Sequence, residues 1–326
     1  MAFDRRLFMK TVAATAGASL LAPHIPSAQA ATPESGVAGG QVAGVYRTKV
    51  GDLQVTSIFD GWMEMTDDIL LTKNPVEAKR LKEKAFLSPD AKPGYLNTFL
   101  IHAGEKLILV DTGARDYGPG TGQLLTNLKA AGVDVAQIDE ILLTHAHPDH
   151  VNGLLDQSGQ KVFPRAKIRI ADEELSFWFD ESKKSAMPDK GGAFDAARKN
   201  LSPYKDSGQI ETFKLGGDLG DGLSSVDLRG HTPGHSGFRI ASGSDQFLIW
   251  GDVVHMQTYQ FTHPEWALTF DIDPSQAIAS RKKILDEVAT DRLRIGGMHL
   301  SFPGIGHVEK VSEGYALVPQ MWEAKL

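Results

Sequence analysis

The sequence predicts an α/β fold built from two halves of similar element order. Strand-like and helix-like segments alternate from residue 46 to the end of the chain, with no second linker between them. The strand pattern of the first half returns in the second, which suggests an internal duplication, although no convincing sequence repeat accompanies it. Several apolar runs end in Gly, Asp or His, as strands do where α/β folds place their sites.

The elements of the first half follow from periodicity and turn residues. Residues 53–61 (LQVTSIFDG) read as a strand entering a turn, and 97–113 (NTFLIHAGEKLILVDTG) as a hairpin that turns at AGEK. Residues 121–132 (TGQLLTNLKAAG) predict a helix closed by a glycine, and 138–145 (IDEILLTH) a buried strand.

Residues 171–205 break this rhythm. They are aromatic and charged around a Pro/Gly-containing middle, and we expect two helices joined by a mobile loop, an insertion that could act as a lid. Beyond them, strands are expected in GLSSVDLRG, SGFRIASG and QFLIWGD, then a helix in PSQAIASRKKILDEVA and a strand in RLRIGGMH.

The N-terminus has the pattern of an export signal. Arg5 and Arg6 precede the apolar stretch TVAATAGASLLA, which ends in the small-residue site SAQA, so residues 1–30 predict a cleaved signal peptide. The paired arginines resemble a twin-arginine signal, with an ordinary secretory signal as the alternative. We therefore expect passage through the twin-arginine machinery to the periplasm or the medium, a flexible start at 31–44 and one domain over 45–326.

Composition narrows the function classes. The 326 residues are 41% hydrophobic and 23% charged with a net charge of −7, so no basic field favours nucleic acid as a partner. The chain has no cysteine, which excludes disulfides, thiolate metal sites and a lipid anchor on cysteine. Stability must come from core burial or from bound metal.

The hexad HAHPDH after the buried strand is the strongest chemical signal. His145 and His147 lie two residues apart, so at an extended strand end both imidazoles point the same way, as one borderline-soft cation requires. Pro148 then starts a turn into a helix, from which Asp149 and His150 project toward a neighbouring position. They could merely cap the helix, but that leaves the first two histidines unexplained. One motif can thus serve two metals.

Further candidate ligands follow other strand signals. His231 and His235 lie in the Pro-Gly turn of RGHTPGHSG, Asp252 ends IWGD, and His299 ends IGGMH. Each stands at a strand end followed by turn residues.

These motifs resemble the metallo-β-lactamase superfamily. THAHPDH, GHTPGHS, GD and MHL occur in the family's order over most of the chain, and LILVDTGA matches its upstream strand and turn. NLKAAG, HLSFPGIGH and GYALVP further resemble the methyl parathion hydrolase branch, which includes organophosphate-degrading enzymes and lactonases. The resemblance implies a four-layer αβ/βα sandwich of two mixed β-sheets flanked by helices.

The resemblance also implies a ligand set for two divalent cations. One ion is expected on His145, His147 and His235, the other on Asp149, His150 and His299, with Asp252 bridging. Asp111 matches an aspartate that steadies the ligand loops, and His231 a structural histidine. Zinc is the expected metal, with manganese, cobalt or iron as alternatives. A hydroxide bridging the cations would be the nucleophile, with Asp149 and Asp252 orienting it.

The substrate is less defined than the chemistry. An aromatic pocket in the parathion-hydrolase branch points to Tyr117, Trp178 and Phe194 as substrate contacts, although such side chains also serve packing. His255, three residues after Asp252, stands where related lactonases carry a tyrosine, and it could donate a hydrogen bond to an oxyanion or simply pack beside the metals.

The sequence therefore predicts a dinuclear-metal hydrolase of phosphotriesters, lactones and aryl esters. A dedicated acyl-homoserine lactonase is the alternative, and a non-catalytic metal-binding protein is the alternative from another class. A β-lactamase is disfavoured by the bridging aspartate, and a ribonuclease by the acidic charge. The related hydrolases suggest a homodimer.

Overall fold

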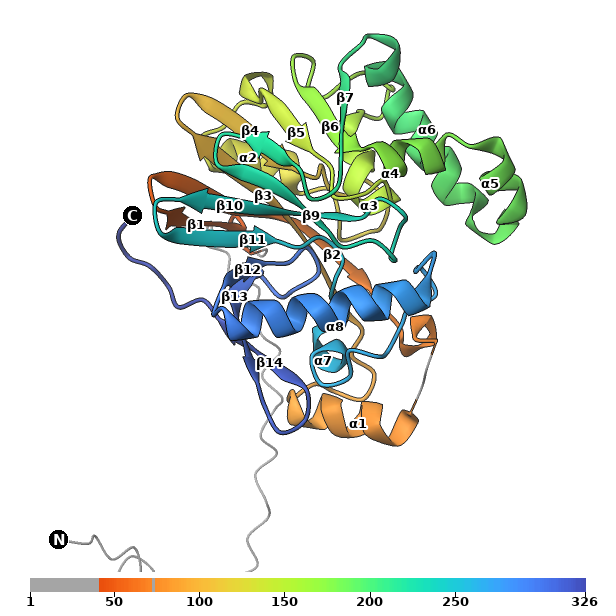
Figure 1. Ribbon diagram of the computed structural model, residues 1–326, viewed down its shortest axis with the longest axis vertical. Helices are drawn as coiled ribbons and strands as arrows, with labels where there is room; N and C mark the ends of the chain where they lie inside the picture. The colour runs from red at the N-terminus through yellow and green to blue at the C-terminus, as the bar shows by residue number, and fades with distance from the viewer. Residues whose placement is uncertain (1–40, 72–73) are drawn as a thin grey trace, which may run out of the picture. The chain divides into compact units, whose positions relative to one another are not determined.

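The computed structural model describes residues 41–71 and 74–326, which form two β-sheets with helices on their outer faces (Figure 1). The signal peptide expected at 1–30 and most of the flexible start expected at 31–44 lie outside the described residues and stay predictions. Over the part of the chain that is described, no helix is both long and apolar enough to span a bilayer.

The first sheet comes entirely from residues 45–213. Its seven strands follow sequence order: β1 (Val45–Val50), β2 (Leu53–Glu64), β3 (Pro93–Ala103), β4 (Lys106–Val110), β5 (Glu140–Leu142), β6 (Lys167–Ala171) and β7 (Ile210–Phe213). Strands β1 to β4 pair antiparallel and β4 to β7 pair parallel. The predicted hairpin at AGEK is the β3–β4 connection.

The second sheet comes from the second half, which agrees with the expected two-part organisation. It contains β8 (Asp218–Gly220), β9 (Leu223–Asp227), β10 (Ser236–Ser242), β11 (Asp245–Ile249), β12 (Arg294–Gly296), β13 (Ile305–Lys310) and β14 (Tyr315–Pro319), again in sequence order. Only the β11–β12 pair is parallel among its strand pairs.

The two sheets pack face to face through an apolar layer. Phe99 and Ile101 of β3 are fully buried there with Phe238 of β10 and Phe247 of β11. The rings of Phe99 and Phe247 meet edge to face, 6.3 Å between centroids. Burying a side chain of this size contributes about 1.5–3 kcal/mol, so the interface between the sheets is a major source of stability.

Helices cover the outer faces. Over the first sheet lie α2 (Leu124–Ala130), α3 (Pro148–Val151), α4 (Asp172–Trp178) and α6 (Gly191–Asp206), and over the second lies α8 (Pro274–Thr290). Helices α1 (Pro75–Lys84) and α7 (Gln257–Gln260) share a smaller apolar cluster. The order helix, sheet, sheet, helix is the predicted four-layer sandwich, so the fold prediction is confirmed.

The segment 171–205 differs from the two helices expected. It forms α4, α5 (Glu181–Ala186), the 3-10 turn Pro188–Lys190 and α6. The extra helix starts at Asp180, whose carboxylate accepts hydrogen bonds from the backbone of Ser182 and Lys183 at an N-cap. Three further 3-10 turns lie at Asp67–Ile69, Val135–Gln137 and Asn152–Leu154.

Candidate metal centre

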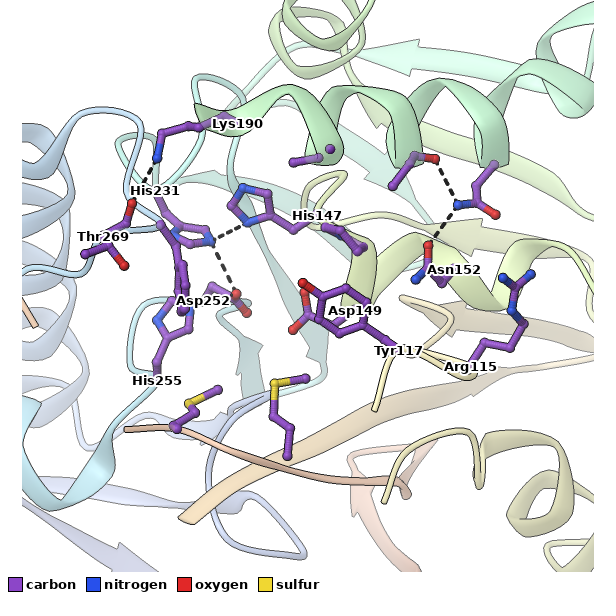
Figure 2. A pocket seen from close by; sticks show the side chains of 18 of the residues that line it. Arg115, Tyr117, His147, Asp149, Asn152, Lys190, His231, Asp252, His255 and Thr269 are labelled. Atoms are coloured by element: carbon purple, nitrogen blue, oxygen red, sulfur yellow. Dashed lines mark hydrogen bonds and ion pairs between the residues drawn. The ribbon is translucent and has the colours of Figure 1, made fainter. Parts of the chain in front are cut away.

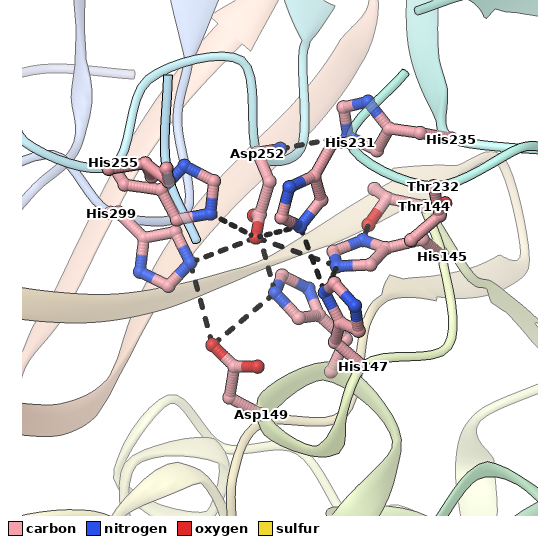
Figure 3. Close-up of polar contacts among 12 residues, drawn as sticks. Thr144, His145, His147, Asp149, His231, Thr232, His235, Asp252, His255 and His299 are labelled. Atoms are coloured by element: carbon pink, nitrogen blue, oxygen red, sulfur yellow. Dashed lines mark hydrogen bonds and ion pairs between the residues drawn. The ribbon is translucent and has the colours of Figure 1, made fainter. Parts of the chain in front are cut away.

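The predicted ligands converge because their strands end at the same edge. Strands β4 and β5 run parallel in the first sheet, so the loops that follow them, with Asp111 and with His145 and His147, emerge side by side. In the second sheet β9, β11 and β12 share one direction, and the loops after them carry His231, Asp252 and His299. Side chains from both sheets thus meet in one cluster (Figure 3).

One group of four donors gathers around Asp252. The Nε2 atom of His145 lies 3.1 Å from Nδ1 of His147, which lies 2.9 Å from Nε2 of His231. Oδ2 of Asp252 closes the group at 3.5 Å from His145 and 3.3 Å from His231. All four donor atoms lie within 4.8 Å of one another, a geometry that suits one cation.

A second group shares Asp252 with the first. Nε2 of His150 lies 3.2 Å from Oδ1 of Asp252, and Nε2 of His299 lies 3.2 Å from Oδ2. Oδ2 of Asp149 lies 3.5 Å from each of these two histidine nitrogens. Because Asp252 belongs to both groups, it is placed to bridge two ions, as the resemblance implied.

Hydrogen bonds on the outer side of the rings fix which nitrogen faces the centre. Nδ1 of His150 donates to Asp111 at 2.7 Å, and Nδ1 of His299 donates to the carbonyl of Tyr95 at 2.9 Å. Nδ1 of His231 donates to Asp271 at 2.8 Å. Each bond leaves the Nε2 lone pair free to point inward, as a metal ligand requires.

Thr144 orients the imidazole of His145 in the same way. Its hydroxyl donates to Oδ2 of Asp111 at 2.7 Å and therefore accepts from Nδ1 of His145 at 3.0 Å. Asp111 thus holds both Thr144 and His150, which is the steadying role expected of it. Its own backbone has a φ of 61°, a left-handed conformation that aspartate tolerates better than most residues.

The expected roles of His231 and His235 are reversed in the structure. His235 was expected as a ligand, but Nδ1 of its ring donates to the carbonyl of Leu228 at 2.9 Å and Nε2 accepts from the backbone N–H of Asp252 at 2.9 Å. Both nitrogens are therefore occupied by backbone, and His235 is the structural histidine. His231, expected to be structural, contributes to the first donor group instead.

The donor set fits a pair of divalent cations. Nε2 of His150 and Oδ1 of Asp252 are buried and have no hydrogen-bond partner among the described residues. Leaving such atoms unpaired in a protein interior costs about 1–3 kcal/mol each, more for a charged group. A cation between them would satisfy both, and imidazole with carboxylate is a donor set typical of zinc and similar ions.

Burial favours the neutral, metal-binding form of two of these histidines. Desolvation holds the pKa of His145 and of His147 well below the usual value, so their imidazoles stay neutral with free lone pairs. Burial also lowers the pKa of His235 to about 3. Desolvation opposes the charge on Asp252, but the histidines around it outweigh this and lower the pKa of its carboxyl.

A cavity of about 730 Å³ opens onto the donor groups (Figure 2). His147, Asp149, His231, Asp252 and His255 reach its surface. Its other walls are mixed: Met63 from the end of β2, Met65 just after that strand, Phe270 from the loop before α8, Tyr117, and one stripe of α6 formed by Gly192, Ala193, Ala196, Lys199 and Asn200. A volume of this size suits a small organic molecule.

Only one of the three aromatic residues expected at the substrate reaches this cavity. Tyr117 is 58% exposed and lies beside Asp149 at the cavity wall (Figure 2). Trp178 and Phe194 are fully buried and pack on each other, 4.7 Å between ring centroids. They hold α4 against α6 as part of the hydrophobic core, so the expectation that they contact substrate is wrong.

Several residues at the site carried no recognised sequence signal. Met63 and Met65 lie two residues apart, at the end of β2 and just beyond it, so a shared direction could have been expected from the period of two of an extended chain. Asp271, which holds His231, comes from a loop with no motif. Glu174, whose carboxylate accepts hydrogen bonds from the backbone of Ala146 and Gly234, belongs to the segment that was expected to be an insertion.

Comparison with known proteins places this geometry in a family. The profile of the metallo-beta-lactamase superfamily matches residues 91–299. The chain belongs to the metallo-β-lactamase superfamily. Among curated proteins, it is similar to the Beta-lactamase-like protein 2 homolog of Drosophila melanogaster, with 42% identity over 69 residues, 20% of this chain and 22% of that protein. The Uncharacterized protein YobT of Bacillus subtilis (strain 168) is 30% identical over 167 residues, 50% of this chain and 63% of that protein. The matches thus span less than two thirds of these relatives.

Solved structures match over a longer range. The hydrolase AbOPH of the β-lactamase superfamily is 34% identical, with a TM-score of 0.83 over 87% of this chain and 100% of that one. AidC, a dizinc quorum-quenching lactonase in complex with an N-hexanoyl-homoserine product, is 29% identical, with a TM-score of 0.80 and the same coverage. With the family and the His/Asp clusters, these likenesses confirm the prediction of a metal-dependent hydrolase that uses divalent metal.

Proposed function

We propose that this metallo-β-lactamase family member is a dinuclear hydrolase that opens lactones and cleaves aryl esters and neutral phosphotriesters. The observation that carries the proposal is the pair of donor groups joined by Asp252 at the inner end of a cavity of about 730 Å³. The proposed ligands are His145, His147 and His231 for one cation, Asp149, His150 and His299 for the other, and Asp252 for both.

Two divalent cations held there would lower the pKa of a water molecule, and their positive charge would stabilise the oxygen that becomes negative during attack. The chain's own residues do the rest. The carboxylates of Asp149 and Asp252 offset part of the positive charge and can orient the attacking water by hydrogen bonding. The cavity walls formed by Met63, Met65 and Phe270 hold the organic part of the substrate and exclude bulk water.

The substrate class rests on the neighbours and on the cavity. AidC is named as a lactonase, and its likeness to this chain covers its full length. The motifs shared with the methyl parathion hydrolase branch support phosphotriesters as a second substrate class. Both kinds of substrate are neutral and place a polarised oxygen beside the carbon or phosphorus that is attacked. A partly apolar cavity that opens onto the two donor groups can accept either kind of substrate.

The decisive experiment joins metal analysis with rates on three substrates. We expect about two divalent cations per chain, zinc among them, and turnover of methyl parathion, an acyl-homoserine lactone and an aryl acetate that a chelator abolishes and added zinc restores. Asp252→Asn should lose most of this activity, because its amide is a poor bridge. A holo-protein with two cations and no turnover on any of the three would instead indicate a metal-binding protein without catalysis.

His255 is proposed to assist by holding Asp252. Its Nε2 lies 2.9 Å from Oδ2 of Asp252, and its ring stacks on His299 with 4.7 Å between centroids and 15° between planes. Its Nδ1 is buried with no hydrogen-bond partner among the described residues. The side chain therefore holds the bridging carboxylate from the side opposite His145 and His147 (Figure 3).

Replacing His255 should separate the substrates. His255→Ala frees Asp252 on one side, and we expect kcat to fall about 10- to 100-fold, the range seen when outer partners of metal sites are removed. A larger fall for the lactone than for the phosphotriester would place His255 near the carbonyl oxygen as well. His255→Gln keeps a hydrogen-bonding side chain and should retain more activity. Rates equal to those of the unaltered protein on all substrates would remove the proposal.

A further inference from the structure

Glu174 is a buried carboxylate that the chemistry above does not use. It lies on α4 and is fully buried, yet no cationic side chain pairs with it in the described structure. Four neutral groups donate to its two oxygens. Burying a carboxylate without a counter-charge is costly, so these four hydrogen bonds must compensate for much of the lost hydration.

Its two oxygens serve two different loops. Oε1 accepts from the backbone N–H of Ala146 at 2.9 Å, and Oε2 accepts from the hydroxyl of Thr232 at 2.6 Å and from the backbone N–H of Gly234 at 2.9 Å. Ala146 stands between His145 and His147. Thr232 follows His231. One carboxylate therefore links the ligand loop of the first sheet to the ligand loop of the second.

A side chain of the same helix also holds the carboxylate of Glu174 in place. Nε1 of Trp178, one turn along α4, donates to Oε1 at 2.6 Å. The ring of Trp178 touches His147 edge to face, 5.4 Å between centroids. Trp178 is fully buried. The carboxylate thus has little freedom to turn away from either loop.

A glycine at the contact point supports the same conclusion independently. A Cβ on Gly234 would come within 2.4 Å of the backbone nitrogen of Glu174 and 2.5 Å of its Cβ. Since Cβ atoms do not approach other atoms that closely, the loop of His231 can reach α4 only because residue 234 has no side chain. The loop and the helix are built to touch at this point.

We propose that Glu174 is a positioning residue, which sets the distance between the imidazoles of His145 and His147 and that of His231 so that the three can hold one cation. This inference rests on the proposed dinuclear site. The loops belong to different sheets, and they bring Nδ1 of His147 and Nε2 of His231 to 2.9 Å. Ring nitrogens that face one another this closely need support from outside the cluster.

The role requires both the length and the two acceptors of glutamate. Glu174→Gln keeps the length, but its amide replaces one of the two acceptor oxygens with an NH2 group. That NH2 group would face a backbone N–H of one of the two loops, where no hydrogen bond can form. Glu174→Asp keeps the charge and both acceptors, but it is one methylene shorter and cannot reach both loops. If charge alone mattered, aspartate would suffice. If the link matters, both substitutions fail.

Cobalt titration of the metal-free full chain provides the test. We expect the unaltered protein to bind two Co²⁺ per chain, and Glu174→Gln and Glu174→Asp to bind one as before and the other about 10- to 100-fold more weakly, with an altered visible absorption spectrum. Glu173→Gln is the matched control, since it makes the same chemical change one residue away on α4, at a carboxylate whose buried Oε2 has no hydrogen-bond partner in the described structure. Its titration should match that of the unaltered protein.

The outcomes separate the two proposals. If the unaltered protein fails to bind two cations, the dinuclear site itself is wrong. If it binds two and both Glu174 variants bind them with the same affinity and spectrum, or if aspartate alone restores both, the positioning role is overturned. Should the Glu174 variants lack the native circular dichroism spectrum, Thr232→Val decides: it removes one hydrogen bond to Oε2, and unchanged cobalt affinity would reject the proposal.

Discussion

At the scale of single residues, the hydrogen-bond partner on the outer side of an imidazole decides whether its inner nitrogen can bind a cation. Nδ1 of His231 donates to the carboxylate of Asp271, and its Nε2 faces His147 in the first donor group. His235 has backbone groups on both. Only three residues lie between them in the sequence, and the Pro-Gly turn there points the two rings in different directions.

The same substitution at these two positions should have opposite consequences. His231→Leu removes a donor, and we expect one of two cations to be lost while the fold remains. His235→Leu leaves the N–H of Asp252 and the carbonyl of Leu228 unpaired in the interior, which costs about 1–3 kcal/mol for each group. We expect a lower free energy of unfolding with two cations still bound. Metal content and urea denaturation measured on both variants would reveal a reversed assignment.

At the scale of elements, α6 divides its residues between core and cavity. Its inner face carries Phe194, Leu201 and Tyr204, which are buried against α4 and the first sheet. Another face lines the cavity with small residues and ends at Lys199 and Asn200. Small side chains leave room for substrate, while the aromatic side chains fix the helix that provides this wall.

This division predicts distinct effects for Phe194 and Tyr117. Phe194→Ala empties a core position and should cost about 3–5 kcal/mol of unfolding free energy, with little change in KM for the molecules that remain folded. Tyr117→Ala removes an exposed cavity residue, so stability should change by less than about 0.5 kcal/mol. KM should then rise about 2- to 12-fold, the value of one aromatic contact. Unfolding curves and Michaelis constants for both variants check the pair, and exchanged phenotypes would contradict it.

An ion-pair cluster joins α1 to the segment that follows α7. The ring of His263 lies 2.9 Å from Glu77 through Nε2 and 2.9 Å from Glu265 through Nδ1, and it stacks on Trp266. Partial burial disfavours the charged imidazole, but the two carboxylates outweigh it and raise the pKa of His263. The Arg80 and His263 hydrogen bonds lower the pKa of Glu77 to about 2, so this carboxylate stays ionised throughout.

This raised pKa gives a pH-dependent contribution with a definite sign. Because the folded protein binds the proton more tightly than the unfolded chain, the contribution is fully present below the unfolded pKa, about 6.5. It is lost as pH rises through the higher folded value. His263→Gln should therefore lower Tm in mildly acidic buffer and change it little in alkaline buffer. A difference in Tm between the two proteins that is constant from pH 5 to 9 would contradict this.

At the scale of the whole molecule, the site exists only where the two sheets meet. Each half of the chain supplies part of the cluster: the hexad from the first sheet, and His231, Asp252 and His299 from the second. Neither half has a complete donor group, because each group combines residues of the hexad with residues of the second half. Packing between the sheets and metal binding are therefore coupled, as expected where a site is assembled from distant segments.

Sequence patterns and the family resemblance predicted the fold class and the two-part organisation, and they named as ligands all but one of the residues that the structure gathers in the two donor groups. These features leave local signatures: apolar period, turn residues, and histidines two apart at a strand end. The steadying role of Asp111 came from the family resemblance, and its hydrogen bonds to Thr144 and His150 are consistent with it.

The choice between His231 and His235 depended on packing between distant segments. So did the choice between cavity and core for Tyr117, Trp178 and Phe194, and the role of Glu174 as a link between loops. Each of these depends on what lies on the other side of a side chain. An imidazole nitrogen, an aromatic ring or a carboxylate has the same residue name whether its partner is a backbone group, a neighbouring helix or an open cavity. That partner comes from a distant part of the chain, so no local pattern records it.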